Sequence, residues 1–354
     1  MTADVNAPLL DTTNPGKTIL VTGAGGCIGS ALTHALLSND AHSLILLDHS
    51  EQNLHELNMQ ILAAGKLGHA AVLGDVLDGA LLTEIFERFR PDTIYHAAAF
   101  KHVPLMESNP LAVVRNNAIG TWELAKTAVR FGAQRLLMIS TDKAVTPRSV
   151  MGASKRIAEL ALLRMANSKT KMNAVRLGNV LGSQGSVGPL FQQQIEHGGP
   201  VTVTHPDARR FFLTLSETVE LILAAAALDD SGKIFVPKMR DPVRIADLAA
   251  RMIQEAGLQT PRDIQITFTG MRPGDKLEEE LFSAQELLEP TGDERLRRVK
   301  GFPVNPEELD AFLGRISSSV DQRNLAALIS ELGNLLPEYQ PSETLLGLLN
   351  PLLA

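Results

Sequence analysis

The sequence has few of the features that mark secreted, membrane or nucleic-acid-binding proteins. Cys27 is the only cysteine among 354 residues, which excludes an intramolecular disulfide and is typical of a reducing compartment. No apolar run approaches the ~20 residues that span a bilayer. The formal net charge is −7, which argues against a nucleic-acid or anionic-membrane surface. We therefore expect a soluble, cytoplasmic protein that binds neither nucleic acid nor membrane.

The first residues also lack the basic start and long apolar run of a signal peptide. We expect a short disordered tail at 1–16. The rest of the chain has the length for one large α/β domain with a smaller lobe beside it.

Strands and helices alternate along the first half of the chain. The apolar runs KTILVT, SLILLD, AAVLGD, DTIYHAAA and RLLMIS have strand character, and segments of helical periodicity separate them. This alternation predicts right-handed crossovers and a doubly wound parallel sheet of the Rossmann type. Ligands of such a sheet bind at the carboxyl ends of its strands.

The composition changes at about residue 182, where glycine, proline and serine increase in GSQGSVGP and HGGP. We expect a Rossmann domain at 17–178, with part of 210–240 returning to it. A smaller α/β lobe should occupy mainly 179–300, and a helical segment should follow at 301–354. Within the lobe, DPVRIADLAARMIQEAG predicts a helix that begins at the Asp-Pro pair.

The segment TGAGGCIG, from Thr22 to Gly29, follows the first predicted strand and opens the first predicted helix. Its spacing is TGxxGxxG, with Gly23, Gly26 and Gly29 in the glycine places. Such a turn brings backbone N–H groups and a helix N-terminus close to a pyrophosphate. A glycine-rich packing turn is the alternative, but the strand before it and the helix after it favour a dinucleotide site.

Asp48 closes the second predicted strand, near the offset at which a carboxylate binds the adenosine ribose. A carboxylate there accepts a hydrogen bond from the 2′-hydroxyl and repels a 2′-phosphate, so NAD is favoured over NADP. Asp48 could instead cap the following helix. Asp75, after the third strand, could contact adenine or form a turn.

Residues 140–155 read STDKAVTPRSVMGASK and follow the apolar run RLLMI. The stretch has no Tyr, His or Cys, and the thioether of Met151 cannot transfer a proton. A TDK tripeptide is often a turn with a solvated charge pair. Here it ends a buried strand at the ligand edge of the sheet, which favours a functional role.

These motifs, in this order, resemble those of an extended short-chain dehydrogenase/reductase. More narrowly, the chain resembles the nucleotide-sugar 4,6-dehydratases of polysaccharide biosynthesis that act on UDP-N-acetylglucosamine. The resemblance covers residue 17 to the end and rests on TGAGGCIG, HAAAFKHVPLMESNP, NNAIGT, STDKAVTPRSVMGASKR, VRLGNVLGSQGSVGPLF, DARRFFLTLSE and GMRPGDKLEEELF.

The resemblance implies which residues carry the chemistry. Lys155 matches the lysine of the superfamily motif YxxxK, which binds the nicotinamide ribose, and Met151 occupies the tyrosine place. Some sugar dehydratases carry Met there and use the Asp and Lys of TDK instead. It follows that Asp142 is the expected acid for water loss and Lys143 the expected base at carbon 5. Thr141 would lie near the 4-hydroxyl.

The resemblance also implies two sets of binding residues and no metal. The cofactor set is Thr22, Gly23, Gly26, Cys27, Ile28, Gly29, Asp48, Asp75, Val76, Ala97, Ala98, Ala99, Asn117 and Lys155. The UDP-sugar set is Lys101, Glu107, Asn179, Arg209, Arg210, Arg272 and Glu279, with Glu279 expected at the uridine ribose. Met151 either lines the sugar pocket or fills a gap in the core. Asn117 either supports the site or caps a helix.

The expected activity is therefore conversion of UDP-N-acetylglucosamine to a 4-keto-6-deoxy sugar, with retention at carbon 5, by a homo-oligomer. One alternative is a UDP-sugar 4-epimerase of the same fold, which needs a base at the tyrosine place and no elimination apparatus. The other is a non-catalytic dinucleotide sensor, which would have no use for Lys155 and the TDK charges.

Overall fold

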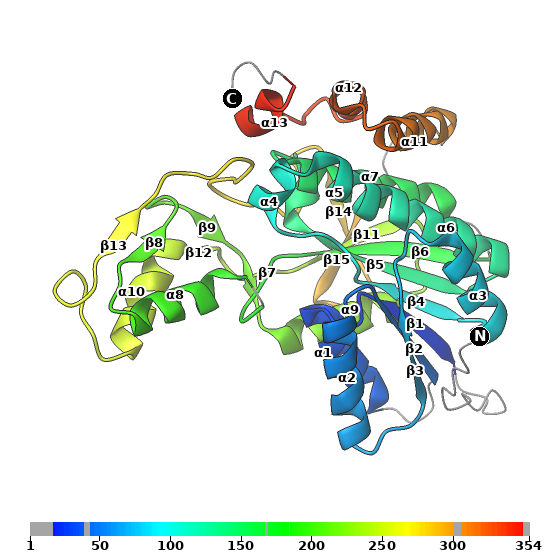
Figure 1. Cartoon of the computed structure of the whole chain (residues 1–354), viewed down its shortest axis with the longest axis horizontal. Helices are drawn as coiled ribbons and strands as arrows, with labels where there is room; N and C mark the ends of the chain where they lie inside the picture. Colours follow the sequence, from blue (N-terminus) through cyan, green and yellow to red (C-terminus); the bar gives the residue numbers. More distant parts are fainter. Residues whose placement is uncertain (1–16, 39–42, 167–168, 184, 301–305, 350–354) are drawn as a thin grey trace, which may run out of the picture.

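The computed structural model describes residues 17–38, 43–166, 169–183, 185–300 and 306–349. The expected tail at 1–16 and both ends of the expected C-terminal segment, 301–305 and 350–354, lie outside the described residues. Three parts are visible in Figure 1: a sheet with its helices, a smaller lobe beside it, and helices α11 to α13 above the α5–α7 layer. None of the helices described is long and apolar enough to cross a bilayer.

The central sheet has nine strands in the order β14-β15-β11-β6-β5-β4-β1-β2-β3. Its parallel strands are β1 (Thr18–Thr22), β2 (Ser43–Asp48), β3 (His69–Leu73), β4 (Thr93–His96), β5 (Arg135–Thr141), β6 (Lys171–Leu177) and β11 (Lys233–Pro237). β15 (Leu296–Lys300) and β14 (Leu287–Pro290) extend it antiparallel. The predicted doubly wound parallel sheet is confirmed. The strand order reverses between β1 and β4, which is where such sheets bind ligands.

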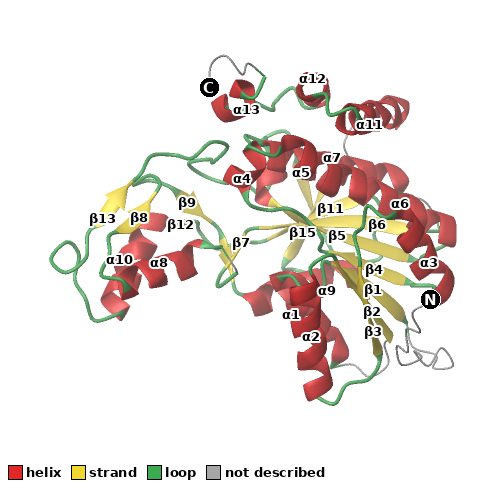
Figure 2. Ribbon diagram, viewed as in Figure 1, coloured by secondary structure: helices red, strands yellow, loops and turns green. Residues whose placement is uncertain are grey.

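Helices cover both faces of this sheet (Figure 2). One face packs against α1 (Cys27–Leu37), α2 (Glu51–Ala63) and α9 (Leu215–Ala227). The other packs against α3 (Gly79–Phe89), α6 (Gly120–Phe131) and α7 (Val150–Met165). Successive strand residues alternate between the two cores, as with Val21 in one and Leu20 in the other. Strands buried on both faces must be apolar throughout, which explains the continuous apolar runs.

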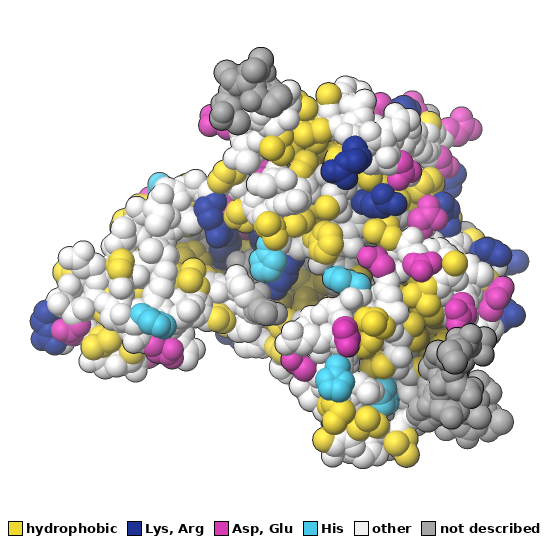
Figure 3. Space-filling model, viewed as in Figure 1, with side chains coloured by type: hydrophobic (Ala, Val, Ile, Leu, Met, Phe, Trp, Pro, Cys, Tyr) yellow, Lys and Arg dark blue, Asp and Glu magenta, His cyan; other side chains and the backbone are white. Residues whose placement is uncertain are grey.

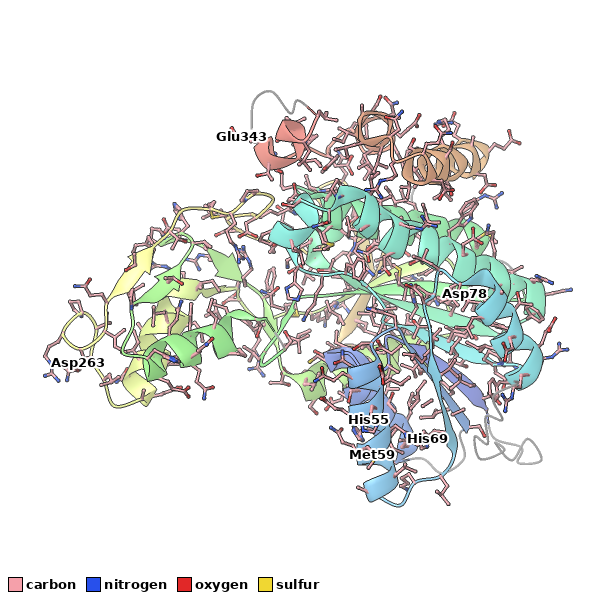
Figure 4. The ribbon with its side chains drawn as sticks, viewed as in Figure 1. His55, Met59, His69, Asp78, Asp263 and Glu343 are labelled. Carbon is pink, nitrogen blue, oxygen red and sulfur yellow. The ribbon has the colours of Figure 1, made fainter. Side chains whose placement is uncertain are left out.

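The lobe has a core of its own. It is built from α8 (Val187–Glu196), β8 (Val201–Val203), α10 (Ile245–Glu255) and β13 (Ile266–Phe268). Two short pairs join it to the sheet region, β7 (Asn179–Val180) with β10 (Phe212–Leu213) and β9 (Arg209–Arg210) with β12 (Val243–Arg244). Asp263 marks its outer end in Figure 4.

The predicted start of the lobe's second helix was wrong. Helix α10 begins at Ile245, four residues after the Asp-Pro pair starts, because Val243 and Arg244 pair with β9. Tertiary pairing therefore overrode a local start signal.

The C-terminal helices form a third layer outside the sheet. α11 (Pro306–Asp321), α12 (Leu325–Leu335) and α13 (Glu343–Gly347) share a core with α4 (Val103–Glu107), α5 (Pro110–Val114), the π-helix η1 (Arg115–Ile119) and the outer side of α7. Helix α7 is consequently buried along most of its length, since it lies between the sheet and this layer.

A buried ion network joins α7 to β6 and to the segment before β14. The guanidinium of Arg176 is fully buried and makes two-pronged hydrogen bonds of 2.7–2.9 Å to both Glu159 and Glu286. Burial alone would raise the pKa of Glu159, but Arg176 and Arg156 more than offset it and lower the pKa to about 2. Ser140 donates a further hydrogen bond to Glu159, at 2.7 Å.

Replacing Arg176 with Met should lower the free energy of unfolding by about 3–5 kcal/mol, because two buried carboxylates lose their partner. Urea denaturation measures the change. The control is Arg315→Met, which removes an arginine that is 53% exposed and pairs with Glu331 at 2.9 Å. That change should cost about 1 kcal/mol or less. Equal losses in the two variants would contradict the role given to the network.

Candidate active site

The glycine turn after β1 packs too closely for larger residues. A Cβ on Gly23, whose φ is +65°, would lie 2.6 Å from the backbone nitrogen of Ala98. A Cβ on Gly29 would lie 2.1 Å from the carbonyl oxygen of Gly23. The turn is therefore held against β4 and α1, and its backbone lies at the carboxyl edge of the sheet. No side chain caps the N-terminus of α1, whose N-cap residue is Gly26.

Asp48 ties this turn to the end of β2. Its side chain accepts hydrogen bonds from the backbone nitrogens of Gly25, at 2.9 Å, and Ser50, at 2.8 Å, and only 5% of the residue is exposed. Ser50, not Asp48, caps α2, since its hydroxyl accepts from the Asn53 backbone nitrogen. The capping alternative for Asp48 is thus excluded.

A pocket opens at the carboxyl ends of β1 to β4. Its lining includes six residues of the predicted cofactor set, Gly23, Asp48, Asp75, Val76, Ala98 and Ala99. It also includes Leu47, His49, Gly74 and Asn116, which the sequence prediction did not include. His49 directly follows Asp48, so its place at a strand end was the available signal. Asn116 lies in the π-helix η1, an element with no simple sequence signature.

Two polar members of the cofactor set, Thr22 and Asn117, form hydrogen bonds with other residues of the protein. Thr22 is fully buried, and its hydroxyl lies 2.7 Å from Nδ1 of His96. Burial, together with the charge of Lys155, lowers the pKa of His96 to about 3, so this ring is neutral. Asn117 hydrogen-bonds the backbone N–H and carbonyl of Phe100 and donates to the Ser154 hydroxyl at 3.0 Å.

Asn117 therefore joins the loop after β4 to α7 and supports the site from behind. Apart from Lys155, the remaining members of the set are apolar or small. Cys27 begins α1, and Ile28 and Ala97 pack against the core on that face of the sheet.

The predicted acid–base pair lies where β5 ends. Asp142 is fully buried in the 3-10 turn η2 (Asp142–Ala144), and its Oδ1 accepts from the Lys143 amine and the Thr141 hydroxyl, both at 2.8 Å. Its Oδ2 is buried and accepts no hydrogen bond from the described residues. The Lys143 side chain is 23% exposed, so it is the member of the pair that faces the opening. Burial by itself lowers the pKa of Lys143. The negative charges of Asp142 and Glu279 raise it by more than that, so the pKa of Lys143 lies above the ordinary value.

Helix α7 packs directly on this turn. A Cβ on Gly152 would lie 2.3 Å from the carbonyl oxygen of Lys143. Lys155, one turn further along, is 4% exposed and donates to the carbonyl of Ile139 at 2.7 Å. Burial lowers the pKa of Lys155 to about 8, although Glu159 opposes the shift. Met151 is 3% exposed within the core that α4, α5 and α7 share, which favours the gap-filling interpretation.

Three members of the predicted UDP-sugar set lie at or near the pair. Asn179 accepts a hydrogen bond from the Lys143 amine at 3.1 Å, and Glu279 lies 3.5 Å from the same amine. Arg210 donates to the backbone carbonyls of Arg209, Lys276 and Leu277, which fixes the 276–279 segment against β9. Figure 3 shows Lys and Arg side chains, in dark blue, in the hollow between the lobe and the sheet region.

The other four members are engaged elsewhere or exposed. Glu107 is fully buried and accepts from the Val150 backbone nitrogen at 2.7 Å and from the Ser342 hydroxyl. Glu107 therefore anchors the start of α7 to the C-terminal layer. In Figure 4 the labelled Glu343, which follows Ser342, shows where α13 begins. Arg209 pairs with Glu278 at 3.4 Å, and Arg272 pairs with Asp275 at 2.8 Å. Lys101 is exposed on the loop after β4.

Within the part of the chain that is described, no cluster of three or more His, Cys, Asp or Glu side chains could hold a metal ion. The site is thus made of two regions along one edge of the sheet, a glycine-lined pocket over β1 to β4 and a charged cluster over β5 and β6. With a buried lysine on the helix after β5, this is the arrangement of an extended short-chain dehydrogenase/reductase.

Comparison with known proteins gives the family within that class. The family described as polysaccharide biosynthesis protein matches residues 19–300, and the chain belongs to this family. It is 45% identical over 313 residues to the capsular polysaccharide biosynthesis protein CapD of Staphylococcus aureus, covering 87% of this chain and 52% of CapD. It is 46% identical over 277 residues to the probable polysaccharide biosynthesis protein EpsC of Bacillus subtilis, covering 77% of this chain and 46% of EpsC. The chain thus spans about half the length of these two relatives.

A solved structure has the same fold over most of the chain. The X-ray structure of Pen from Bacillus thuringiensis superposes with a TM-score of 0.73 at 27% identity, covering 84% of this chain and 97% of Pen.

The buried amine of Lys155 should make stability depend on pH. Its pKa is about 8 in the folded protein, against 10.5 for an ordinary lysine. Between these values the unfolded chain binds more protons than the folded one, so the free energy of unfolding rises with pH. Relative to Lys155→Met, the unmodified chain should gain about 2–3 kcal/mol between pH 7 and pH 10. Urea denaturation of both proteins measures the gain, and an identical pH dependence would contradict it.

Proposed function

We propose that this chain is an NAD-dependent nucleotide-sugar 4,6-dehydratase that acts on UDP-N-acetylglucosamine. The Asp142–Lys143 pair at the end of β5, with Asp142 fully buried and Lys143 partly exposed, is the observation that carries the proposal. Elimination of water needs an acid and a base, and the pair offers both side by side. A 4-epimerase needs a base at the tyrosine place, where Met151 has no proton to exchange.

The names of the relatives support a role in surface-polysaccharide synthesis. CapD is named for capsular polysaccharide and EpsC for polysaccharide biosynthesis, and both share more than two fifths of their aligned residues with this chain. We infer that the keto sugar made here is a precursor for such a polymer.

The residues around the pocket fit NAD. Gly23 and Gly29 let the turn pack against the protein backbone, and Gly26, where a Cβ would meet only the Gly23 carbonyl oxygen within 4 Å, leaves room for a pyrophosphate beside the uncapped N-terminus of α1. The Asp48 carboxylate has lone pairs left for a ribose hydroxyl and would repel a 2′-phosphate. When bound, NAD supplies the reversible oxidation of carbon 4 and the reduction of carbon 6.

The chain's own residues then move the protons. Lys143 is the accessible member of the pair, and Asp142 exchanges a proton with it along their 2.8 Å hydrogen bond. One proton shift from Lys143 to Asp142 gives a neutral amine, the base for carbon 5, and a carboxylic acid for the departing 6-hydroxyl. The Lys143 ammonium later returns its proton to carbon 5, and the proton released from the 4-hydroxyl restores the single proton of the pair. Thr141 holds the Asp142 carboxylate in place through its hydroxyl. Lys155, buried beneath, is the group assigned to the nicotinamide ribose.

We further propose that configuration at carbon 5 is retained, because Met in the tyrosine place resembles the retaining enzymes. An NMR spectrum of the product decides this point. A 4-keto-6-deoxy sugar of the xylo series supports retention, and the inverted sugar would refute it.

Asp142→Asn and Lys143→Met should each slow water elimination about 100-fold or more, since each removes one of the two proton-transfer groups. The assay is incubation with UDP-N-acetylglucosamine followed by mass spectrometry for loss of one water. NAD binding, measured by calorimetry, should persist in both variants. Lys126→Met, which removes an exposed lysine paired with Glu123, is the control and should retain activity.

Other outcomes of this assay would overturn the proposal. Turnover retained in either variant would remove the pair from the mechanism. A product of unchanged mass and new stereochemistry would indicate a 4-epimerase, and NAD binding with inert sugar would indicate a sensor. Met151→Tyr should change the rate little, because proton transfer already belongs to the pair.

Gly26→Ala tests the cofactor site separately. The backbone at Gly26 has φ −70°, which alanine adopts, and a Cβ would lie 3.2 Å from the carbonyl oxygen of Gly23, so the fold should accept alanine with a shift of a few tenths of an ångström. The methyl group would occupy the space of the pyrophosphate and should weaken NAD binding about 10-fold or more. Gly79→Ala, where a Cβ meets nothing within 4 Å, is the control. Equal affinity in the two variants would place the pyrophosphate elsewhere.

A further inference from the structure

One oxygen of the Glu279 carboxylate is buried and receives no hydrogen bond within the described part of the chain. Only 6% of the residue is exposed, and its Oε2 accepts no hydrogen bond from any residue that the structure describes. Three cations lie at ion-pair distance from it: Lys143 at 3.5 Å, Lys276 at 3.8 Å and Arg210 at 3.9 Å. Buried carboxylates normally accept several hydrogen bonds, so a carboxylate held by charge alone needs an explanation.

Lys143 lies between this carboxylate and that of Asp142. Its amine is 2.8 Å from Oδ1 of Asp142 and 3.5 Å from Oε1 of Glu279. The two carboxylates come from distant parts of the chain, η2 and the segment after the lobe's β13. Arg210 fixes the second, since it donates to the carbonyls of Lys276 and Leu277 just before Glu279.

The elimination requires that the Asp142–Lys143 pair hold one proton in total. With that proton on Lys143 the pair rests, and with the proton on Asp142 it offers an acid and a neutral amine. If the proton is lost to solvent, the pair keeps a base but has no acid for the 6-hydroxyl. A second carboxylate beside Lys143 opposes this loss.

We propose that Glu279 is a positioning residue that acts through Lys143, holding the amine beside Asp142 and keeping on the pair the single proton that elimination needs. This inference rests on the proposed dehydration. It differs from the sequence-based hypothesis that Glu279 binds the uridine ribose, because the Glu279 carboxylate lies 3.5 Å from the Lys143 amine.

Glu279→Gln keeps the shape of the side chain and removes its charge. The groups that face Lys143 are Asp142, Glu279 and Arg210, with Lys276 behind Glu279. Without the Glu279 charge, the pKa of Lys143 should fall by about 1–3 units. Competitive labelling of the full chain with trace acetic anhydride over a pH series, read by peptide mass spectrometry, measures this pKa without any assay of activity.

The matched control is Glu278→Gln. Glu278 is one residue earlier, its side chain is 61% exposed, and it pairs with Arg209, so this change should leave the pKa of Lys143 unaltered. If Glu279→Gln does not fold, Lys276→Met is compared with the double variant Lys276→Met/Glu279→Gln. The double variant removes one positive and one negative charge, so the net charge of the cluster is unchanged. Lys143 should then have the lower pKa in the double variant. An equal pKa of Lys143 with and without the Glu279 charge would overturn the inference.

Kinetics separates positioning from ligand contact. In Glu279→Gln the alkaline limb of kcat should move to lower pH by the same shift as the Lys143 pKa, and KM for UDP-N-acetylglucosamine should change less than about 2-fold. A raised KM with an unmoved pH profile would mean that Glu279 touches the ligand, which contradicts the proposal. If the unmodified chain eliminates no water, the proposed function fails, while labelling still decides whether Glu279 controls Lys143.

Discussion

The buried guanidinium of Arg176 is the interaction on which the geometry of the site depends. It links Glu159 on α7 with Glu286 before β14, and it also donates to the carbonyl of Leu281 at 3.1 Å. A charge taken out of water is costly unless it is fully paired, so these three elements can occupy only the arrangement that pairs it. That arrangement sets α7 against the end of β5 and fixes the segment that carries Glu279.

The site built on this frame places its charges unequally. Over β1 to β4 the chain offers backbone and two aspartates, Asp48 and Asp75, whereas over β5 and β6 it gathers two carboxylates and three cations. The first environment suits an extended ligand bound by backbone groups, and the second suits proton transfer. The proposed chemistry needs no tyrosine in place of Met151, because the proposed proton-transfer groups lie at the strand end and not on the helix.

The sequence was sufficient where the physics is local. Apolar runs predicted the strands, because a strand buried on both faces has to be apolar throughout. The glycine spacing predicted the turn after β1, because only glycine fits there. Local signals failed where a distant segment pairs with the chain. The Asp-Pro pair predicted the start of α10, but the residues after it pair with β9, so the helix begins later. The anchoring role of Glu107 was equally out of reach, since its partners Val150 and Ser342 lie on segments remote in sequence.

The sequence by itself therefore determined the succession of strands and helices along the chain, the glycine turn, and the presence of the charged pair Asp142–Lys143 at a strand end. These follow from short-range patterns of polarity and size. Tertiary structure alone decided that Met151 packs in the core, that Lys143 rather than Asp142 faces the opening, and that Glu279 stands beside Lys143. Burial and electrostatic fields depend on residues that the fold brings together from distant positions in the sequence, so local sequence patterns do not predict them.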